Sequence, residues 1–309
     1  MKKTVAFILF TFIWVLNSFS QEFGTHWISH AFGNDSSEVF FCHTYITRHK
    51  PQKAFITVAS TGRLRVYVNE RNISRDVFLK NEKENTVTLR TYDITNVLSP
   101  DSNTIAVWYS PCEESASNKQ LSLEYYGTDA QGTPFYHVAA EDWSSMNVEG
   151  CHIKDKEEFF DNRFIDSSWK AAGRKPTWSH PLFTHPFMQN EDSIQDKGKK
   201  DLLTQLSSFP ATDNLLKRVY SPVAETEDSA GVHYDFGLTF KGTVRITLRN
   251  AKKGEKIRID GLQYTCSGEM DEQAFRHFST TEQRIVTVTG DKTFRKSQIQ
   301  KIEGLRIGE

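Results

Sequence analysis

The chain has 309 residues, and its 38 Lys and Arg are balanced by 39 Asp and Glu, which gives a formal net charge of -1. A charge so close to zero creates no general field for nucleic acid or anionic lipid, so neither is predicted as a partner. Aromatic residues make up 12% of the chain, a share that suits β-rich packing and leaves rings for stacking on sugars.

The first twenty residues have the composition of a secretory signal peptide. Two lysines precede an apolar run at residues 5–16, and Ser18 and Ser20 follow it. The run is too short to cross a bilayer, whose core needs about twenty residues. We therefore expect cleavage before Gln21 and a periplasmic or secreted mature protein. No later segment is apolar enough to span a membrane.

Apolar and polar residues alternate at period two through most of the mature chain. This pattern is typical of half-buried β-strands, and turn-forming residues separate the segments at close spacing. A short helical turn capped by Asp93 is expected at residues 93–98. The clearest predicted strands lie around residues 39–45, 64–68, 105–107, 121–125, 244–248 and 257–259.

We predict an all-β protein of two antiparallel jelly-roll or β-sandwich domains joined by an irregular connector. After the signal peptide at residues 1–20, the first domain is expected at 22–140, the connector at 141–213 and the second domain at 214–309. The connector is assigned because Trp, Pro and His replace the alternating pattern after residue 140, and charged residues follow them.

Three segments of the first domain, at residues 54–69, 91–98 and 103–108, share a strand-and-turn pattern with a known family. Further segments follow at residues 157–163 and 164–170 of the connector and at 234–244, 254–257, 268–271 and 303–306 of the second domain. In this order they resemble bacterial α-L-rhamnosidases of glycoside hydrolase family 78. The first set looks like the family's N-terminal jelly-roll module, the second domain is similar to the β-sandwich that precedes the catalytic barrel, and the connector is a weaker match.

The resemblance implies a galactose-binding-like jelly roll followed by a concanavalin-like sandwich. In the family the catalytic carboxylates lie on a helical barrel that comes after these modules, so the resemblance implies no catalytic residue here. Hydrolysis by this chain alone is not expected. Sugar-binding jelly rolls of the family hold calcium with an Asp/Asn pair in a loop where this sequence has Ser60, Thr61 and Gly62. Neutral hydroxyls suit calcium poorly, so no metal or other cofactor is predicted.

Four residues are the candidate ligand contacts. Alternation places Arg65, Tyr67 and Asn69 on one face of a strand, and a ring flanked by hydrogen-bonding groups suits a sugar. The alternative is that Arg65 and Tyr67 simply cover the solvent side of the sheet. Trp27 is the preferred stacking platform among the tryptophans, and its alternative role is packing over the end of the first domain.

Acidic residues crowd one turn at Glu269, Asp271 and Glu272. A glycosidase needs two carboxylates of unequal pKa at a defined separation. In a chain with 39 acidic residues such groups arise freely, so a structural role is predicted. Asp235 is expected to fix a strand end through backbone hydrogen bonds.

The histidines and cysteines show no metal-binding spacing. His180 and His185 are each followed by a proline, and no third ligand can be assigned, so rigid loop packing is predicted. A bridge between Cys112 and Cys151 and a set of mostly free buried thiols are both open for an exported chain. The cysteines are Cys42, Cys112, Cys151 and Cys266, without a C-x-x-C pair.

The favoured hypothesis is an exported accessory protein that binds a plant or host glycan without cleaving it. The first alternative is an α-L-rhamnosidase fragment or subunit that is active only with a missing or separate barrel, which would make a glycoside hydrolase its partner. The second is a protein-interaction module with exposed sheet edges. A deep cleft holding two opposed carboxyl groups of different pKa would overturn the favoured hypothesis.

Overall fold

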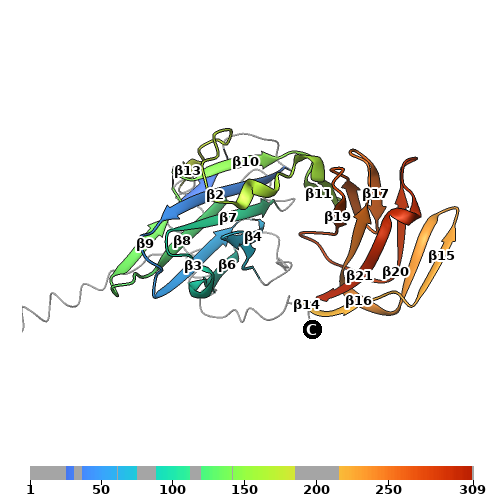
Figure 1. Ribbon diagram of the computed structural model, residues 1–309, viewed down its shortest axis with the longest axis horizontal. Coiled ribbons are helices and arrows are strands. Elements are labelled where there is room, and N and C mark those ends of the chain that lie inside the picture. The colour runs from blue at the N-terminus through green and yellow to red at the C-terminus, as the bar shows by residue number, and fades with distance from the viewer. Residues whose placement is uncertain are drawn as a thin grey trace, which may run out of the picture.

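The computed structural model describes residues 26–30, 37–60, 62–74, 88–111, 120–140, 142–184 and 216–307. The predicted signal peptide with its cut before Gln21 lies outside these residues, as do Cys112 and His185. The described part is all-β, as predicted, and forms two bodies of strands arranged along the long axis (Figure 1). Within it, no helix combines the length and the apolar character needed to cross a bilayer.

The first domain is a sandwich of two antiparallel sheets. The first sheet has the order β13-β1-β8-β3-β6, and β9 also pairs with β8. Strand β8 therefore pairs with β1 at one end and with β9 at the other. The strands of this sheet are β1 (Trp27–Ser29), β3 (Lys53–Ser60), β6 (Thr88–Asp93), β8 (Gln120–Thr128), β9 (Pro134–Val138) and β13 (Leu182–Thr184).

The second sheet of this domain has the order β10-β2-β7-β4-β5. Alternate residues of its strands point toward the first sheet, so Phe41 and Val66 share one buried core with Ile56 and Leu123. This is the period-two pattern that the sequence predicts. The strands are β2 (Glu38–Ile46), β4 (Arg63–Val68), β5 (Arg71–Asn72), β7 (Ser102–Ser110) and β10 (Ser144–Val148).

The second domain is one curled sheet of ten strands, with the order β11-β12-β18-β17-β20-β16-β21-β14 and with β15 and β19 also paired to β16. The long strand β16 makes this possible, because its register shifts between Asp235 and Phe240 and both halves bury residues in one core. The strands are β11 (His152–Lys154), β12 (Glu157–Asp161), β14 (Leu216–Tyr220), β15 (Ala224–Asp228), β16 (Gly231–Arg249), β17 (Lys256–Ile259), β18 (Leu262–Thr265), β19 (Asp271–Ala274), β20 (Thr281–Gly290) and β21 (Ile299–Ile307).

Helical structure in the described part consists of short 3-10 turns. The predicted turn after Asp93 is present, and the Asp93 carboxylate accepts the N–H of Thr95 at 3.0 Å. Asp161 and Asp166 cap two other turns in the same way. The turns are η1 (Thr95–Val97), η3 (Asn162–Phe164), η4 (Ser167–Lys170) and η6 (Lys296–Gln298).

The segment between the domains differs from the irregular connector that we predicted. Strands β10 and β13 extend the two sheets of the first domain, while β11 and β12 belong to the sheet of the second. Residues 142–184 are thus divided between the two domains. The four strands have only three to five residues each, and so short a run gives too few alternations for the period to show in the sequence.

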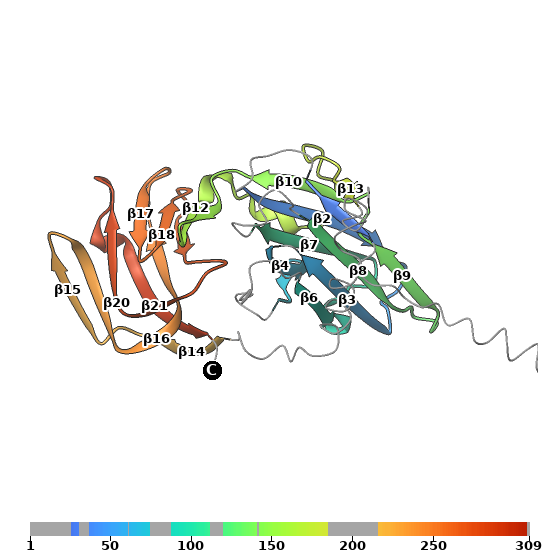
Figure 2. The same cartoon turned by 180° about the vertical axis from the view of Figure 1, so that it is seen from behind.

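The two domains share a core on the outer face of the second sheet. Strand β2 is buried on both faces, because its odd and even residues belong to different clusters. Phe40 stacks on Trp169 of η4 with ring centroids 4.0 Å apart, and Trp108 meets Phe278 edge-on at 5.3 Å. Strand β12 lies at this boundary when the molecule is seen from behind (Figure 2). The domains therefore form one packed unit.

Candidate functional site

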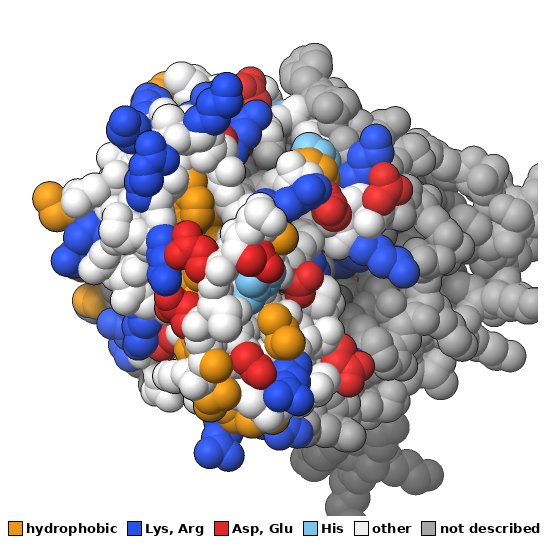
Figure 3. Space-filling model, turned by 90° about the vertical axis from the view of Figure 1, so that its right-hand side faces the viewer, with side chains coloured by type: hydrophobic (Ala, Val, Ile, Leu, Met, Phe, Trp, Pro, Cys, Tyr) orange, Lys and Arg blue, Asp and Glu red, His pale blue; other side chains and the backbone are white. Residues whose placement is uncertain are grey.

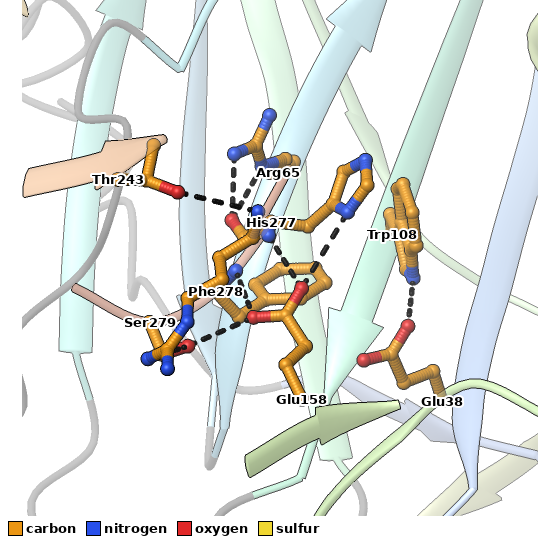
Figure 4. A network of polar contacts seen from close by, with 9 residues as sticks. Glu38, Arg65, Trp108, Glu158, Thr243, His277, Phe278 and Ser279 are labelled. Carbon is orange, nitrogen blue, oxygen red and sulfur yellow. Dashed lines mark hydrogen bonds and ion pairs between the residues drawn. The ribbon is translucent and has the colours of Figure 1, made fainter. Parts of the chain in front are cut away.

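The strand predicted to bind a ligand faces the second domain. Arg65 is only 6% exposed, and its Nε and Nη2 donate to the carbonyl oxygen of His277 at 2.9 and 2.6 Å (Figure 4). The expectation that Arg65 and Tyr67 lie on an open or solvent-facing surface is therefore corrected. That face of the sheet is covered because β12, η4 and the segment after β19 pack onto it.

Tyr67 and Asn69 also make internal contacts. The ring of Tyr67 meets Trp169 edge-on at 5.2 Å, and Lys170 Nζ lies 4.9 Å from its centroid. The Asn69 amide donates to the carbonyl of Val97 at 2.9 Å and accepts the N–H of Thr104 at 3.0 Å. Asn69 thus braces the first domain, Tyr67 packs in the core shared by the two domains, and the ligand binding of both stays a prediction.

Trp27 lies in the other sheet, away from these three residues. It is 1% exposed and packs with Ala59 in a small buried cluster. Nearby, His30 Nδ1 lies 2.8 Å from Ser145 Oγ. The alternative role, packing within the first domain, fits this burial, and the structure does not join Trp27 to the other three predicted contacts.

A buried polar network, which we call the interdomain clasp, consists of Arg65, Glu158, His277, Phe278 and Ser279 (Figure 4). Glu158 accepts the N–H of His277, the N–H of Phe278 at 3.1 Å and the hydroxyl of Ser279 at 2.9 Å. Burial opposes its ionisation, but these bonds hold the pKa of Glu158 below its usual value. Burial also lowers the pKa of His277. The clasp thus fixes the segment onto which Arg65 docks.

A second buried carboxyl group, Glu38, lies beside the clasp. Trp108 Nε1 donates to Glu38 Oε2 at 2.6 Å. Burial, together with the charge of Glu158, raises the pKa of Glu38 to about 8. The two glutamates therefore have the split pKa values of a catalytic pair. Both are 1% exposed, and donors of the same chain already occupy them: Trp108 bonds Glu38 within the first domain, and Glu158 joins the domains.

The other acidic cluster is structural, as predicted. Glu272 is buried and accepts the N–H groups of Ser267 and Gly268 at 2.9 and 2.7 Å. Asp271 pairs with Arg249 at 2.8 Å. Glu272 thus holds a turn closed, and Asp271 links two neighbouring strands.

Asp235 fixes backbone as predicted, although within a strand. Its carboxylate accepts the N–H of Gly237 at 2.7 Å, and it also pairs with Arg284. Gly237 has φ +75°, a conformation that favours glycine. The contact therefore stabilises the irregularity at which β16 changes register.

The described thiols fit the second of the two cysteine alternatives. Cys42, Cys151 and Cys266 are free and buried. Burial raises the pKa of Cys42 to about 11 and that of Cys151 well above its usual value, so these thiols are unreactive. Among the described residues no three His, Cys, Asp or Glu side chains could hold a metal ion together.

Sequence reasoning missed a pocket of about 430 Å³. It lies at the end of the first domain where β9 is found, remote from the second domain (Figure 1). We call it the distal pocket. The loop after β2 forms one wall, and the β8–β9 hairpin forms the other. The residues that matter below are Arg48, His49, Tyr125, Asp129, Phe135 and His137.

Aromatic rings form the floor and one wall of this pocket. The ring centroid of Tyr125 lies 4.9 Å from that of Phe135, 5.8 Å from that of His137 and 5.1 Å from that of Tyr45. Burial, followed by the proximity of His43, lowers the pKa of His137. Flat rings beside hydrogen-bonding groups are the combination that suits a sugar.

The hydroxyl of Tyr125 is the unusual atom of this site. Tyr125 is 1% exposed, and its Oη has no hydrogen-bond partner among the described residues. Burial raises its pKa to about 12, so the group stays protonated. In contrast, the neighbouring Tyr45 hydroxyl receives the Trp143 Nε1–H at 3.3 Å. A buried donor without a partner is costly, which sets Tyr125 apart from the paired Tyr45 beside it.

The hairpin side of this pocket could be predicted from the sequence. Tyr125 and His137 flank the turn-forming residues 127–132, and a hairpin there places them directly opposite each other on one face. The loop at residues 47–51 comes from the other sheet of the sandwich. Its approach to the hairpin is a tertiary contact, and the hairpin pattern alone did not reveal a pocket.

No family model and no curated protein matches this sequence. Among solved structures, an α-L-rhamnosidase from Dictyoglumus thermophilum is similar, with a TM-score of 0.73 and 16% identity over 93% of this chain and 36% of that chain. The enzyme from Aspergillus terreus matches with a TM-score of 0.68 and 14% identity over 93% and 36%. The Streptomyces avermitilis enzyme, solved with L-rhamnose, matches with a TM-score of 0.68 and 16% identity over 88% and 28%. This chain therefore has the fold of a part, about a third of the length, of α-L-rhamnosidases.

Proposed function

We propose that this protein is an exported, non-catalytic carbohydrate-binding unit related to the β-domains of α-L-rhamnosidases. The observation that carries the proposal is the distal pocket, where aromatic rings surround an unpaired buried hydroxyl in Tyr125. Its ligand is a plant or host glycan. The likeness to three rhamnosidases supports a carbohydrate context, because this chain shares the fold of part of each.

The charges of the pocket favour binding over cleavage. Glycoside hydrolysis requires a pair of carboxyl groups on either side of the scissile bond. The described lining of the distal pocket includes one carboxylate, Asp129. Its Oδ1 already accepts the N–H groups of Gln131 and Thr133, both at 2.8 Å. An acid that is fixed in a turn in this way is poorly placed to donate a proton to a leaving group.

The union of the two domains fits an accessory role. The shared core and the clasp hold the domains as one body, which leaves the distal pocket at the end remote from the second domain. A rigid unit with a ligand site at one end can hold a glycan while the other end contacts a partner. Rigidity also lowers the entropy that such an assembly loses on binding.

Binding to a glycan array and retention on polysaccharide affinity gels test this function, with mature protein starting at Gln21. Phe135→Ala removes a wall of the pocket and is expected to abolish retention. Phe55→Ala is the control, because Phe55 lies in β3 and stacks on Tyr126 outside the pocket lining. Silence of the unaltered protein on every glycan would contradict the proposal.

Turnover of an aryl α-L-rhamnoside tests the non-catalytic part. We expect no release of the aryl group above a blank. Release that disappears on Glu269→Gln, at the exposed acid of that cluster, and persists on the control Glu282→Gln would instead establish a glycosidase. Export is tested separately by the N-terminus of the protein recovered from the cell envelope or medium, which is expected to be Gln21.

A second candidate function is docking onto a partner glycoside hydrolase. Val223 and Ile285 are 71% and 57% exposed. Both lie beside Asp235, because the Val223 N–H donates to the Asp235 carbonyl and Ile285 is the partner of Asp235 in the neighbouring strand. Charged side chains of both signs and apolar ones are interspersed on the outer end of this domain (Figure 3). Co-purification of a hydrolase that is lost on Ile285→Glu and kept on Thr287→Glu would favour docking.

A further inference from the structure

The polar groups of the distal pocket differ in how they are engaged. The charged side chains of the described lining are Arg48 and Asp129, and His49 and His137 add imidazole groups. Because Asp129 Oδ1 accepts two backbone N–H groups, part of its negative charge is already compensated. Arg48 is therefore the charged group that is best placed to pair with a ligand, which favours an anion.

The guanidinium of Arg48 differs from several of those in the second domain. Arg245, Arg249 and Arg284 each form an ion pair with a carboxylate of a neighbouring strand. Arg48 is exposed and has no ion pair among the described residues. An unpaired guanidinium at the rim of an aromatic pocket offers a planar fork of N–H groups, and that geometry matches a carboxylate in a two-point contact.

We propose that the distal pocket binds the terminal ring of an acidic saccharide, a hexuronic acid whose carboxylate pairs with Arg48 while its ring packs on Phe135. This inference rests on the proposed carbohydrate function and adds the chemical class of the ligand. Tyr125 contributes its ring to the lining beneath the sugar. His137, whose pKa is lowered by burial, is neutral at pH 7 and can donate to or accept from another hydroxyl.

The size of the pocket indicates the end of a glycan. Its volume of about 430 Å³ is at the small end of the range for ligand pockets, which is roughly 300 to 1,000 Å³. One or two sugar rings fill such a space. The aromatic floor closes the pocket on the side of the sandwich core, because Tyr45 and Tyr125 belong to that core. A chain end is therefore favoured over the middle of an extended polymer.

The test uses matched sugars that differ in one group. Methyl glucuronide and methyl galacturonide carry a carboxylate where methyl glucoside and methyl galactoside carry a hydroxymethyl group. Dissociation constants come from calorimetry on the mature two-domain protein at low ionic strength. We expect one uronide to bind about tenfold more tightly than its neutral parent, since a charge-assisted bond is worth about 1.5 kcal/mol or more. Added salt should reduce the difference, because Arg48 is exposed.

Two variants connect this preference to the pocket. Arg48→Gln is expected to give the acidic and the neutral sugar equal dissociation constants. The control Arg71→Gln, at an exposed arginine of β5, should keep the preference for the acidic sugar. Phe135→Ala should weaken the binding of both sugars of a pair by about tenfold or more. Far-ultraviolet circular dichroism and the unfolding midpoint establish that each variant is folded.

Each outcome decides the inference. Equal affinity for acidic and neutral sugars, or a preference that survives Arg48→Gln, overturns the acidic ligand and leaves the carbohydrate function standing. Binding of other glycans that is insensitive to Phe135→Ala moves the site elsewhere on the protein. Absence of binding to any glycan removes both this inference and the proposed function.

Discussion

The clasp side and the pocket end of the first domain are built from similar residues but differ in what faces them, since the clasp side packs against the second domain and the pocket end is open. On the clasp side, Trp108 donates to Glu38, and Arg65 donates twice to a carbonyl. At the pocket end, Tyr45 is paired, whereas Tyr125 has no hydrogen-bond partner and Arg48 no ion pair among the described residues.

This difference separates structure from function in a chain that is rich in aromatic residues. Rings that other parts of the chain cover pack a core, and their polar neighbours give it orientation. Rings that line an open pocket beside an unpaired guanidinium form a surface that a ligand can complete. Trp27, Arg65 and Tyr67 belong to the first kind, since each is buried by other parts of the same chain.

The largest expected effect breaks the clasp. Glu158→Gln keeps the shape of the side chain but removes the charge that three hydrogen-bond donors approach. We expect the free energy of unfolding to fall by about 3 kcal/mol. Urea unfolding measures it, and the single transition should begin to separate into two. Glu157→Gln is the control, because Glu157 is half-exposed and pairs with Arg258. This variant should lower the free energy of unfolding by less than about 1 kcal/mol. Equal losses in both variants would contradict the role of the clasp.

The next effect depends on pH. The pKa of Glu38 is about 8 in the folded protein and 4.5 as its ordinary value, so the folded state binds more protons than the unfolded chain between these values. The free energy of unfolding therefore falls as the pH rises from 4.5 to 8, by an amount on the order of a few kcal/mol. Glu38→Gln should flatten this dependence. A variant whose stability changes with pH as steeply as that of the unaltered protein would show that Glu38 is not the group responsible.

A smaller effect concerns the contact between the domains. Arg65→Lys retains the charge but loses the fork that spans the His277 carbonyl, and we expect a loss of about 1 to 2 kcal/mol in urea unfolding. The exposed Arg71 of β5 serves as the control, and Arg71→Lys should have no measurable effect. If the two variants behave alike, the double bond from Arg65 does not hold the domains.

The smallest effect sharpens the comparison at the pocket. Tyr125→Phe removes a hydroxyl without a partner, so the free protein should be unchanged or more stable by less than about 1 kcal/mol. Tyr45→Phe removes the acceptor of the Trp143 N–H and should cost about 1 kcal/mol. Thermal unfolding measures both. A clear destabilisation by Tyr125→Phe would mean that its hydroxyl is already satisfied.

Local patterns were sufficient for the strands and for the turn after Asp93, because both depend on neighbours within a few residues. They predicted the buried faces of β2, β4 and β8 from alternation. They failed for Arg65 and Tyr67, where alternation indicated the face correctly but not what covers it. The covering residues, such as Glu158 and His277, are 93 and 212 positions away from Arg65.

The amino-acid sequence by itself determined the all-β class, since period-two burial and turn residues act locally. Tertiary structure decided which faces stay open. It placed β12 and the segment after β19 over the polar face of β4, and it brought the loop after β2 to the β8–β9 hairpin. Contacts between distant segments leave no periodic trace in the chain, so only the folded structure shows that Arg65 is buried and that Tyr125 lines a pocket.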